Sequence, residues 1–200
     1  MIEERLLKSG LVAIAGVDEA GRGACAGPLV VAAVILKDPQ DKSLTDVRDS
    51  KELTQETREA LLPIILKASA AHAIIEIAPN EIDSIGLHKS NIEGMRRAIS
   101  ALNPCPDYVL TDGYEIKGIS VPNLAVWKGD QVAITISAAS ILAKVHRDRL
   151  MVALDKNYPG YGFAEHKGYV TGAHTAALER IGVSPIHRKS YANIARLINK

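Results

Sequence analysis

Two adjacent carboxylates, Asp18 and Glu19, interrupt an apolar run that begins at Val12. The run is rich in Val and Ile, which is typical of a buried strand, and a glycine-rich turn and a second apolar run follow it directly. A carboxylate in a buried strand must be paired, hydrogen-bonded, protonated or bound to a cation. Because successive strand residues point to opposite faces, we expect this strand to end at a site where at least one of the pair meets a cation.

Two further carboxylates lie where other elements begin or end. Asp112 closes the apolar run 107–112 and precedes a glycine, and Asp130 follows a glycine just before a long helical pattern. Taken singly, each would be explained as a turn residue, since Asp-Gly and Gly-Asp are common turn pairs. A parallel strand would carry Asp112 to the carboxyl end of a sheet. Their combination with Asp18 therefore favours a shared site.

Charge is distributed unevenly along the chain. Residues 1–143 hold 14 Lys and Arg against 19 Asp and Glu, whereas residues 144–200 hold 10 against 4, together with four of the six His. An acidic centre beside a basic surface suits a metal-dependent enzyme that acts on a polyanion. A helical tail with a solvated basic face would explain the asymmetry equally well.

The apolar patterns predict the elements that position these residues. Strands are expected at 12–20, 28–36, 71–78 and 107–112, with a short extended segment within 119–127, and the first two should form an antiparallel hairpin. Helices are expected at 54–70, 80–101, 134–157, 171–181 and 190–199, with Thr54 as a cap and Pro63 kinking or splitting the first. This order predicts an α/β layered fold with a mixed sheet.

Composition restricts the class of protein. Two hundred residues with 47% hydrophobic content suit one well-buried domain. Cys25 and Cys105 show no metal-binding spacing, which predicts a reducing compartment and no structural metal. No apolar run approaches the length of a membrane span. We therefore expect a soluble, cytoplasmic protein with no membrane partner and, since no obligate interface is indicated, a monomer.

Four motifs together resemble bacterial ribonuclease HII, the type 2 ribonuclease H, from about residue 12 to residue 190. They are Gly16-Val-Asp-Glu-Ala-Gly-Arg-Gly23, Asp112-Gly113, Gly129-Asp130 followed by Ala138-Ala-Ser-Ile-Leu-Ala-Lys-Val-His-Arg-Asp-Arg149, and Tyr161-Gly-Phe-Ala-Glu-His-Lys-Gly-Tyr169. Any one alone would be weak evidence. Four in the family's order are highly specific.

The resemblance implies a ribonuclease H-like fold with a five-stranded mixed sheet flanked by helices. The chain would form a single catalytic domain over residues 1–200, with residues 158–200 as a loop-plus-helix C-terminal extension. Family members cut the RNA strand of RNA/DNA hybrids and nick duplex DNA on the 5′ side of an embedded ribonucleotide. They leave a 3′ hydroxyl and a 5′ phosphate. Such hybrids and ribonucleotide-containing duplexes are thus the expected partners, in ribonucleotide excision repair among other settings.

The resemblance also assigns roles to residues. It implies metal-binding carboxylates at Asp18, Glu19, Asp112 and Asp130. It implies that the backbone of Gly21, Arg22 and Gly23 approaches the ribose 2′-hydroxyl. It also implies that Tyr169 stacks on the sugar beyond the ribonucleotide. Two divalent cations ~4 Å apart would suit attack on a phosphodiester, and Mg²⁺ or Mn²⁺ prefers such oxygen ligands. Asp18 is expected to bridge them. Candidates for phosphate contact are Lys51, Lys144, Arg147 and Lys167.

Three other interpretations compete with this one. Gly21 to Ala26 also fits a dinucleotide-binding turn, but that turn requires a helix next and a β-branched run follows instead. A non-catalytic nucleic-acid-binding module would explain the basic end while leaving the carboxylates unexplained. A transposase or junction resolvase of the same fold would explain the carboxylates, but would not need the Gly-Arg-Gly turn for a 2′-hydroxyl.

Overall fold

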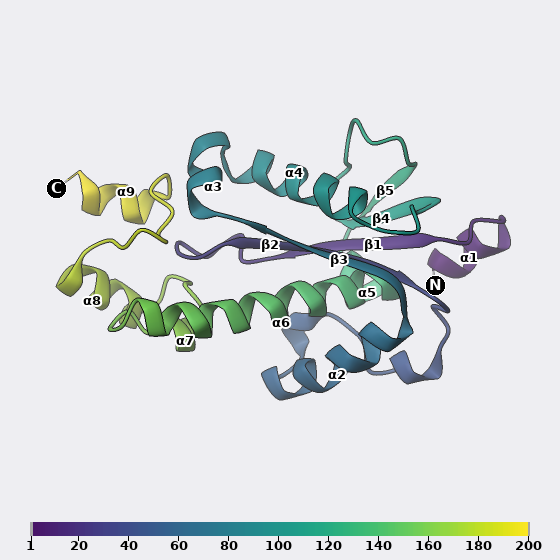
Figure 1. Cartoon of the computed structure of the whole chain (residues 1–200), viewed down its shortest axis with the longest axis horizontal. Helices are drawn as coiled ribbons and strands as arrows, with labels where there is room; N and C mark the ends of the chain where they lie inside the picture. Colours follow the sequence, from purple (N-terminus) through teal and green to yellow (C-terminus); the bar gives the residue numbers. More distant parts are fainter. Residues whose placement is uncertain (1, 200) are drawn as a thin grey trace.

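The computed structural model describes residues 2–199, which form a five-stranded sheet with helices on both faces (Figure 1). The strand order is β3-β2-β1-β4-β5. Strand β2 pairs antiparallel with both β1 and β3, whereas β1 with β4 and β4 with β5 are parallel pairs. The bounds are β1 Ile14–Ala20, β2 Leu29–Leu36, β3 Ser69–Ile77, β4 Tyr108–Asp112 and β5 Asn123–Val126. The predicted mixed sheet and its opening hairpin are confirmed.

Helices α3 and α4 cover one face of the sheet, and α2 and α6 cover the other (Figure 1). All eight positions of β2 are buried, because helices lie on both sides of it. The bounds are α1 Ile2–Lys8, α2 Gln55–Ala68, α3 Pro79–Ile85, α4 Leu87–Ser100, α5 Gly129–Val132, α6 Ile134–Asn157, α7 Phe163–His166, α8 Gly172–Ile181 and α9 Ala192–Ile198. Two short 3₁₀ helices, Lys42–Leu44 and Ser50–Glu52, interrupt the polar loop after β2.

In helix α2, the predicted cap is present but the break expected at Pro63 is not. Thr54 caps it as predicted, because its side chain accepts a hydrogen bond from the backbone N–H of Thr57 at 3.2 Å. Pro63 does not split the helix, which runs without interruption to Ala68. A proline removes only one backbone hydrogen bond, and the buried face of α2 around Leu61 and Ile65 holds the helix against the core. Strand β3 then begins two residues earlier than predicted.

Helix α1 was not predicted, and it has a structural role at the start of α6. The carboxylate of Glu3 is fully buried and accepts hydrogen bonds from the backbone N–H of Thr135 at 3.0 Å and from its hydroxyl at 2.9 Å. An anion at a helix N-terminus is stabilised by the free N–H groups and the helix dipole. The first turn of α6 is thereby fixed.

Close packing between β1 and α6 also depends on Gly16. A Cβ atom at this position would lie 2.1 Å from the carbonyl carbon of Thr135 and 2.3 Å from the nitrogen of Ile136. Both are backbone atoms, so no side-chain rotation could make room. The absence of a side chain at Gly16 lets α6 approach the strand that carries Asp18.

The C-terminal part packs at one end of the sheet, where α7, α8 and α9 lie together (Figure 1). Its apolar cluster joins Phe163, Leu178 and Ile194 to Cys25 and Ala26, which follow β1 in the chain. This part therefore covers the turn between β1 and β2. Within residues 2–199, none of the helices combines the length and apolarity that crossing a bilayer would require.

Candidate active site

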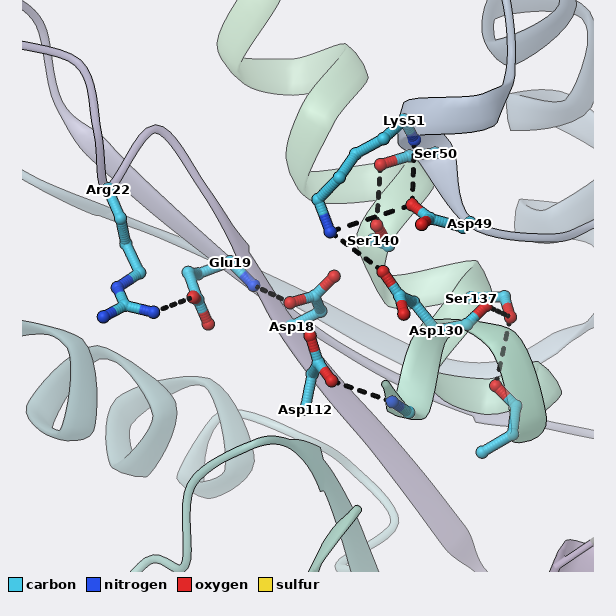
Figure 2. A network of polar contacts seen from close by, with 12 residues as sticks. Asp18, Glu19, Arg22, Asp49, Ser50, Lys51, Asp112, Asp130, Ser137 and Ser140 are labelled. Carbon is cyan, nitrogen blue, oxygen red and sulfur yellow. Dashed lines mark hydrogen bonds and ion pairs between the residues drawn. The ribbon is translucent and has the colours of Figure 1, made fainter. Parts of the chain in front are cut away.

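Asp18, Asp112 and Asp130 converge at one edge of the sheet (Figure 2). Strands β1 and β4 are parallel, and Val17 pairs with Thr111, so Asp18 and Asp112, the next residue of each strand, lie side by side toward the carboxyl ends of these strands. Asp130 comes from α5, just before α6. Each residue offers a carboxylate oxygen, and these three oxygens all lie within 4.8 Å of one another. This spacing fits carboxylates that share a cation.

Hydrogen bonds join β4 to α5 and α5 to α6, and one further bond orients the Asp18 carboxylate on β1. The Oδ1 atom of Asp112 accepts a bond from the backbone N–H of Gly129 at 2.8 Å, which joins the end of β4 to α5. The hydroxyl of Ser137 donates to the carbonyl of Asp130 at 2.8 Å, which joins α5 to α6. Asp18 accepts from the backbone N–H of Glu19 at 2.7 Å. The cluster is therefore held by backbone as well as by packing.

The electrostatics of this cluster favour a bound cation. Burial raises the pKa of the Asp18 carboxyl well above its usual range, and the charges of Glu19 and Asp112 raise it further. Burial also raises the pKa of Asp130, although Lys51 opposes that effect. Buried carboxylates that repel one another are an unfavourable arrangement unless positive charge is added. Oxygen donors alone make up this set, which suits a hard divalent cation.

Glu19 lies at the side of this cluster. Its Oε1 atom is 3.3 Å from Nη1 of Arg22, and Figure 2 shows the carboxylate turned toward that side chain. Its Oε2 atom is buried and accepts no hydrogen bond from residues 2–199. Burial raises the pKa of Glu19, and the charge of Arg22 partly offsets this. The structure thus groups three of the four predicted carboxylates and leaves the fourth beside them with a free oxygen.

Lys51 reaches the same cluster from the loop after β2. Its ammonium lies 2.9 Å from Oδ2 of Asp130 and 3.8 Å from Oδ1 of Asp49 (Figure 2). Burial lowers the pKa of Lys51, but the hydrogen bond and charge of Asp130 outweigh that effect and raise it. Asp49 also accepts from the backbone N–H of Lys51 at 2.9 Å and so fixes its position. A role for Asp49 in positioning Lys51 was not predicted from the sequence. The sequence feature that indicates it is the place of Asp49 two residues before Lys51 in a polar loop.

The Gly-Arg-Gly turn and Tyr169 line a pocket of about 440 Å³ together with carboxylates of the site. Gly21 has a φ of +93°, a conformation that favours glycine, and a Cβ there would lie 2.0 Å from Nε of Arg147. A Cβ at Gly23 would lie 3.8 Å from the ring of Tyr169. The lining is Asp18, Glu19, Ala20, Gly21, Arg22, Gly23, Ser50, Lys51, Asp112, Ser140, Lys144 and Tyr169.

The other basic candidates differ in where the structure places them. Lys144 lines the pocket and pairs with the buried Asp148 at 2.7 Å. Lys167 lies outside this lining and donates to the carbonyl of Ala164. Arg147 is fully buried, and its guanidinium donates to the carbonyls of Pro28 at 3.0 Å and Ala26 at 3.1 Å. The predicted phosphate contact of Arg147 is therefore wrong. Its side chain is buried and supports the backbone of the turn after β1.

Trp127 was not anticipated as part of the site. It is 82% exposed and lines a neighbouring pocket of about 380 Å³ together with Asp112, Lys128 and Asp130. The available signal was its position, since the chain's single tryptophan directly precedes Lys128, Gly129 and Asp130. A large apolar side chain left in solvent at the rim of a charged pocket is a candidate for contact with a ligand.

Comparisons with known proteins agree with this geometry. The family model described as ribonuclease HII matches residues 15–194. Ribonuclease HII from Mycobacterium avium is 54% identical over 99% of this chain and 86% of its own length, and that from Rhodococcus opacus is 53% identical over 100% and 88%. The crystal structure of ribonuclease H2 from Pyrococcus horikoshii aligns with a TM-score of 0.79 at 27% identity, over 93% of this chain and 97% of that one. The chain therefore belongs to the ribonuclease HII family.

Proposed function

We propose that this protein is a divalent-metal-dependent endonuclease that cuts the RNA strand of RNA/DNA hybrids and nicks duplex DNA 5′ of an embedded ribonucleotide. The products would be a 3′ hydroxyl and a 5′ phosphate. One observation carries the proposal: Asp18, Glu19 and Asp112 share one pocket with the Gly-Arg-Gly turn and Tyr169, and Asp130 belongs to the same carboxylate cluster. We further propose that it acts as a cytoplasmic monomer, with residues 1–200 as one catalytic domain that includes the extension at 158–200.

The carboxylates would hold the metal. Asp18, Asp112 and Asp130 offer oxygens close enough to share cations, and Glu19 has a buried oxygen without a partner beside them. Two bound Mg²⁺ or Mn²⁺ ions would activate the attacking water and stabilise charge on the leaving 3′ oxygen. The charges of both Glu19 and Asp112 act on the Asp18 carboxyl, and Asp18 is the residue proposed to bridge the two ions. Lys51, now paired with Asp130, would be free to contact phosphate once cations balance the carboxylates.

Recognition of the ribose would come from the other side of the pocket. The absence of side chains at Gly21 and Gly23 lets a sugar approach the backbone, whose N–H and C=O groups can bond a 2′-hydroxyl. Tyr169 presents a ring directly beside Gly23. Lys144 lies 5.7 Å from the centre of that ring and is proposed to contact a neighbouring phosphate. DNA, which lacks the 2′-hydroxyl, would leave these backbone groups unpaired.

The decisive experiment uses a labelled DNA duplex with one ribonucleotide and an all-DNA duplex of identical sequence. Each is incubated with Mg²⁺, with Mn²⁺ and with chelator. We expect a metal-dependent nick only in the ribonucleotide duplex and only on its 5′ side. Cleavage of both duplexes would instead indicate a different nuclease of this fold, and binding without cleavage would indicate a non-catalytic module.

Replacement of Tyr169 by Ala is expected to slow cleavage at a single ribonucleotide about 5- to 100-fold, which is the range for loss of one stacked aromatic contact. Long hybrids should lose less, because they offer many cleavable positions. Steady-state rates on both substrates test this, with Tyr169→Phe as the control that keeps the ring. Equal loss on both substrates would contradict a role for Tyr169 at the junction.

A further inference from the structure

The imidazoles of three histidines, His166, His174 and His187, lie together next to the backbone of Tyr169, and the proposed reaction uses none of them. His166 stacks on His174, with ring centres 4.3 Å apart, and His174 Nε2 lies 3.0 Å from His187 Nε2. They come from three separate segments: α7, α8 and the stretch before α9. His174 and His187 are both buried, at 1% exposure each.

The hydrogen bonds assign one tautomer to each of the two buried rings. The backbone N–H of Ser184 donates to His187 Nδ1 at 3.0 Å, so this nitrogen carries no proton. The proton of His187 is therefore on Nε2, which donates to His174 Nε2 at 3.0 Å. His174 must then carry its proton on Nδ1, which donates to the carbonyl oxygen of Tyr169 at 2.9 Å. The result is a directed relay from Ser184 to Tyr169.

Both rings of the relay are neutral. Burial lowers the pKa of His187 to about 4, and burial likewise lowers the pKa of His174. Nor do the rings offer a site for a metal. His166 is saturated as well, because its Nδ1 accepts from the N–H of Gly168 at 3.2 Å and its Nε2 donates to the carbonyl of Tyr161 at 2.8 Å. Each ring nitrogen of the three histidines thus has a protein partner.

The segment that begins this relay is also bonded to the turn after β1. The N–H of Arg188 donates to the carbonyl of Cys25 at 2.8 Å, and the N–H of Gly27 donates to the carbonyl of Ile186 at 2.9 Å. The buried guanidinium of Arg188 donates to the carbonyl of Arg22 at 3.2 Å. One segment, 184–188, therefore holds the backbone of the Gly-Arg-Gly turn directly and holds Tyr169 through two imidazoles.

We propose that His174 and His187 are positioning residues, which hold Tyr169 against the Gly-Arg-Gly turn and thereby set selectivity for the ribonucleotide junction. This inference rests on the proposed function of Tyr169. Neither histidine lines the pocket, so each acts through the tyrosine. The relay fixes the distance between the Gly-Arg-Gly turn, which would meet the ribose, and Tyr169, which would meet the next sugar.

A double-mutant cycle between His174 and Tyr169 tests the proposal. His174→Leu removes the donor to the Tyr169 carbonyl and should raise KM for the single-ribonucleotide duplex about 5- to 10-fold, the usual value of one such hydrogen bond. In the Tyr169→Ala background the same change should cause no further loss. His174→Asn is the matched control, because its shorter amide can still donate near the former Nδ1 position and should recover most of the affinity.

Each alternative outcome is distinct. If His174→Leu costs as much in the Tyr169→Ala background as in the wild type, the histidine is only structural and the inference is wrong. If Tyr169→Ala itself leaves cleavage unchanged, the stacking part of the proposed function fails first and the inference fails with it. Should His174→Leu not fold, His174→Gln replaces it, because its longer amide reaches toward His187 and not toward Tyr169.

Nuclear magnetic resonance offers a readout that does not depend on activity. Long-range ¹H–¹⁵N spectra of the wild-type protein should show neutral rings at neutral pH, with the proton on Nδ1 in His174 and on Nε2 in His187. The opposite tautomer in either ring, or a charged imidazolium, would overturn the relay.

Discussion

Asp18→Asn is expected to reduce cleavage of the single-ribonucleotide duplex by about 10³-fold or more while leaving the fold intact. Asp18 is 3% exposed and offers an oxygen within 4.8 Å of oxygens of both Asp112 and Asp130, so its carboxylate can share cations with both. An amide has the same shape but carries no charge and only one acceptor oxygen. The site should therefore lose affinity for the metal and the geometry that the remaining carboxylates share.

The same substitution should stabilise the protein when metal is absent. The pKa of Asp18 is raised in the folded state by burial and by the charge of Glu19. Such a group contributes stability that is present below its unfolded pKa and is lost as the pH rises through its folded pKa. At neutral pH the wild type thus bears a cost that the neutral amide removes. Relief of about 1 kcal/mol would raise Tm by roughly 2–4 °C for a chain of this size.

Two measurements on Asp18→Asn separate these effects. Cleavage is measured in Mg²⁺ and Mn²⁺, and thermal unfolding is followed with chelator and with each metal. We expect metal to raise the Tm of the wild type much more than that of the variant. Asp46→Asn, at an exposed loop position, is the matched control and should behave like the wild type. Near-normal turnover by Asp18→Asn would remove Asp18 from the metal site.

The grouping of Asp18 with Asp112 was accessible from the sequence because strand ends have a regular geometry. Each residue follows an apolar stretch toward the end of its strand, and parallel neighbours bring such residues to the same end of the sheet. The long helix at 134–157 was equally readable, and its predicted bounds coincide with α6. These features depend on local periodicity, which the sequence displays directly.

Arg147 shows why other features could not be predicted. It lies on α6 among polar neighbours, and local sequence describes it as a surface cation. It is buried only because the turn after β1 folds over that end of α6, a contact between residues more than 100 positions apart. The histidine relay is hidden for the same reason. His174 and His187 lie on separate segments whose spacing indicates nothing until the chain is folded.

Gly16→Ala is expected to destabilise the protein by about 2–4 kcal/mol, a drop in Tm of roughly 5–15 °C. The added methyl carbon would lie 2.1 Å from the carbonyl carbon of Thr135, and such a contact can be relieved only by moving α6 away from β1. Glu3 resists that movement, since its carboxylate holds the N–H and the hydroxyl of Thr135. The strain is therefore divided between the sheet and the first turn of the helix.

The same displacement should reach the active site, which makes Gly16→Ala more than a stability variant. Asp130 is joined to α6 through Ser137, so it moves with the helix while Asp18 stays with β1. We expect weaker metal binding, seen as a higher Mg²⁺ concentration for half-maximal cleavage at a temperature where the variant remains folded. Gly172→Ala is the matched control, because a Cβ there meets no atom within 4 Å. If Gly16→Ala unfolds earlier but needs no more Mg²⁺, the position of Asp130 does not depend on how closely α6 approaches β1.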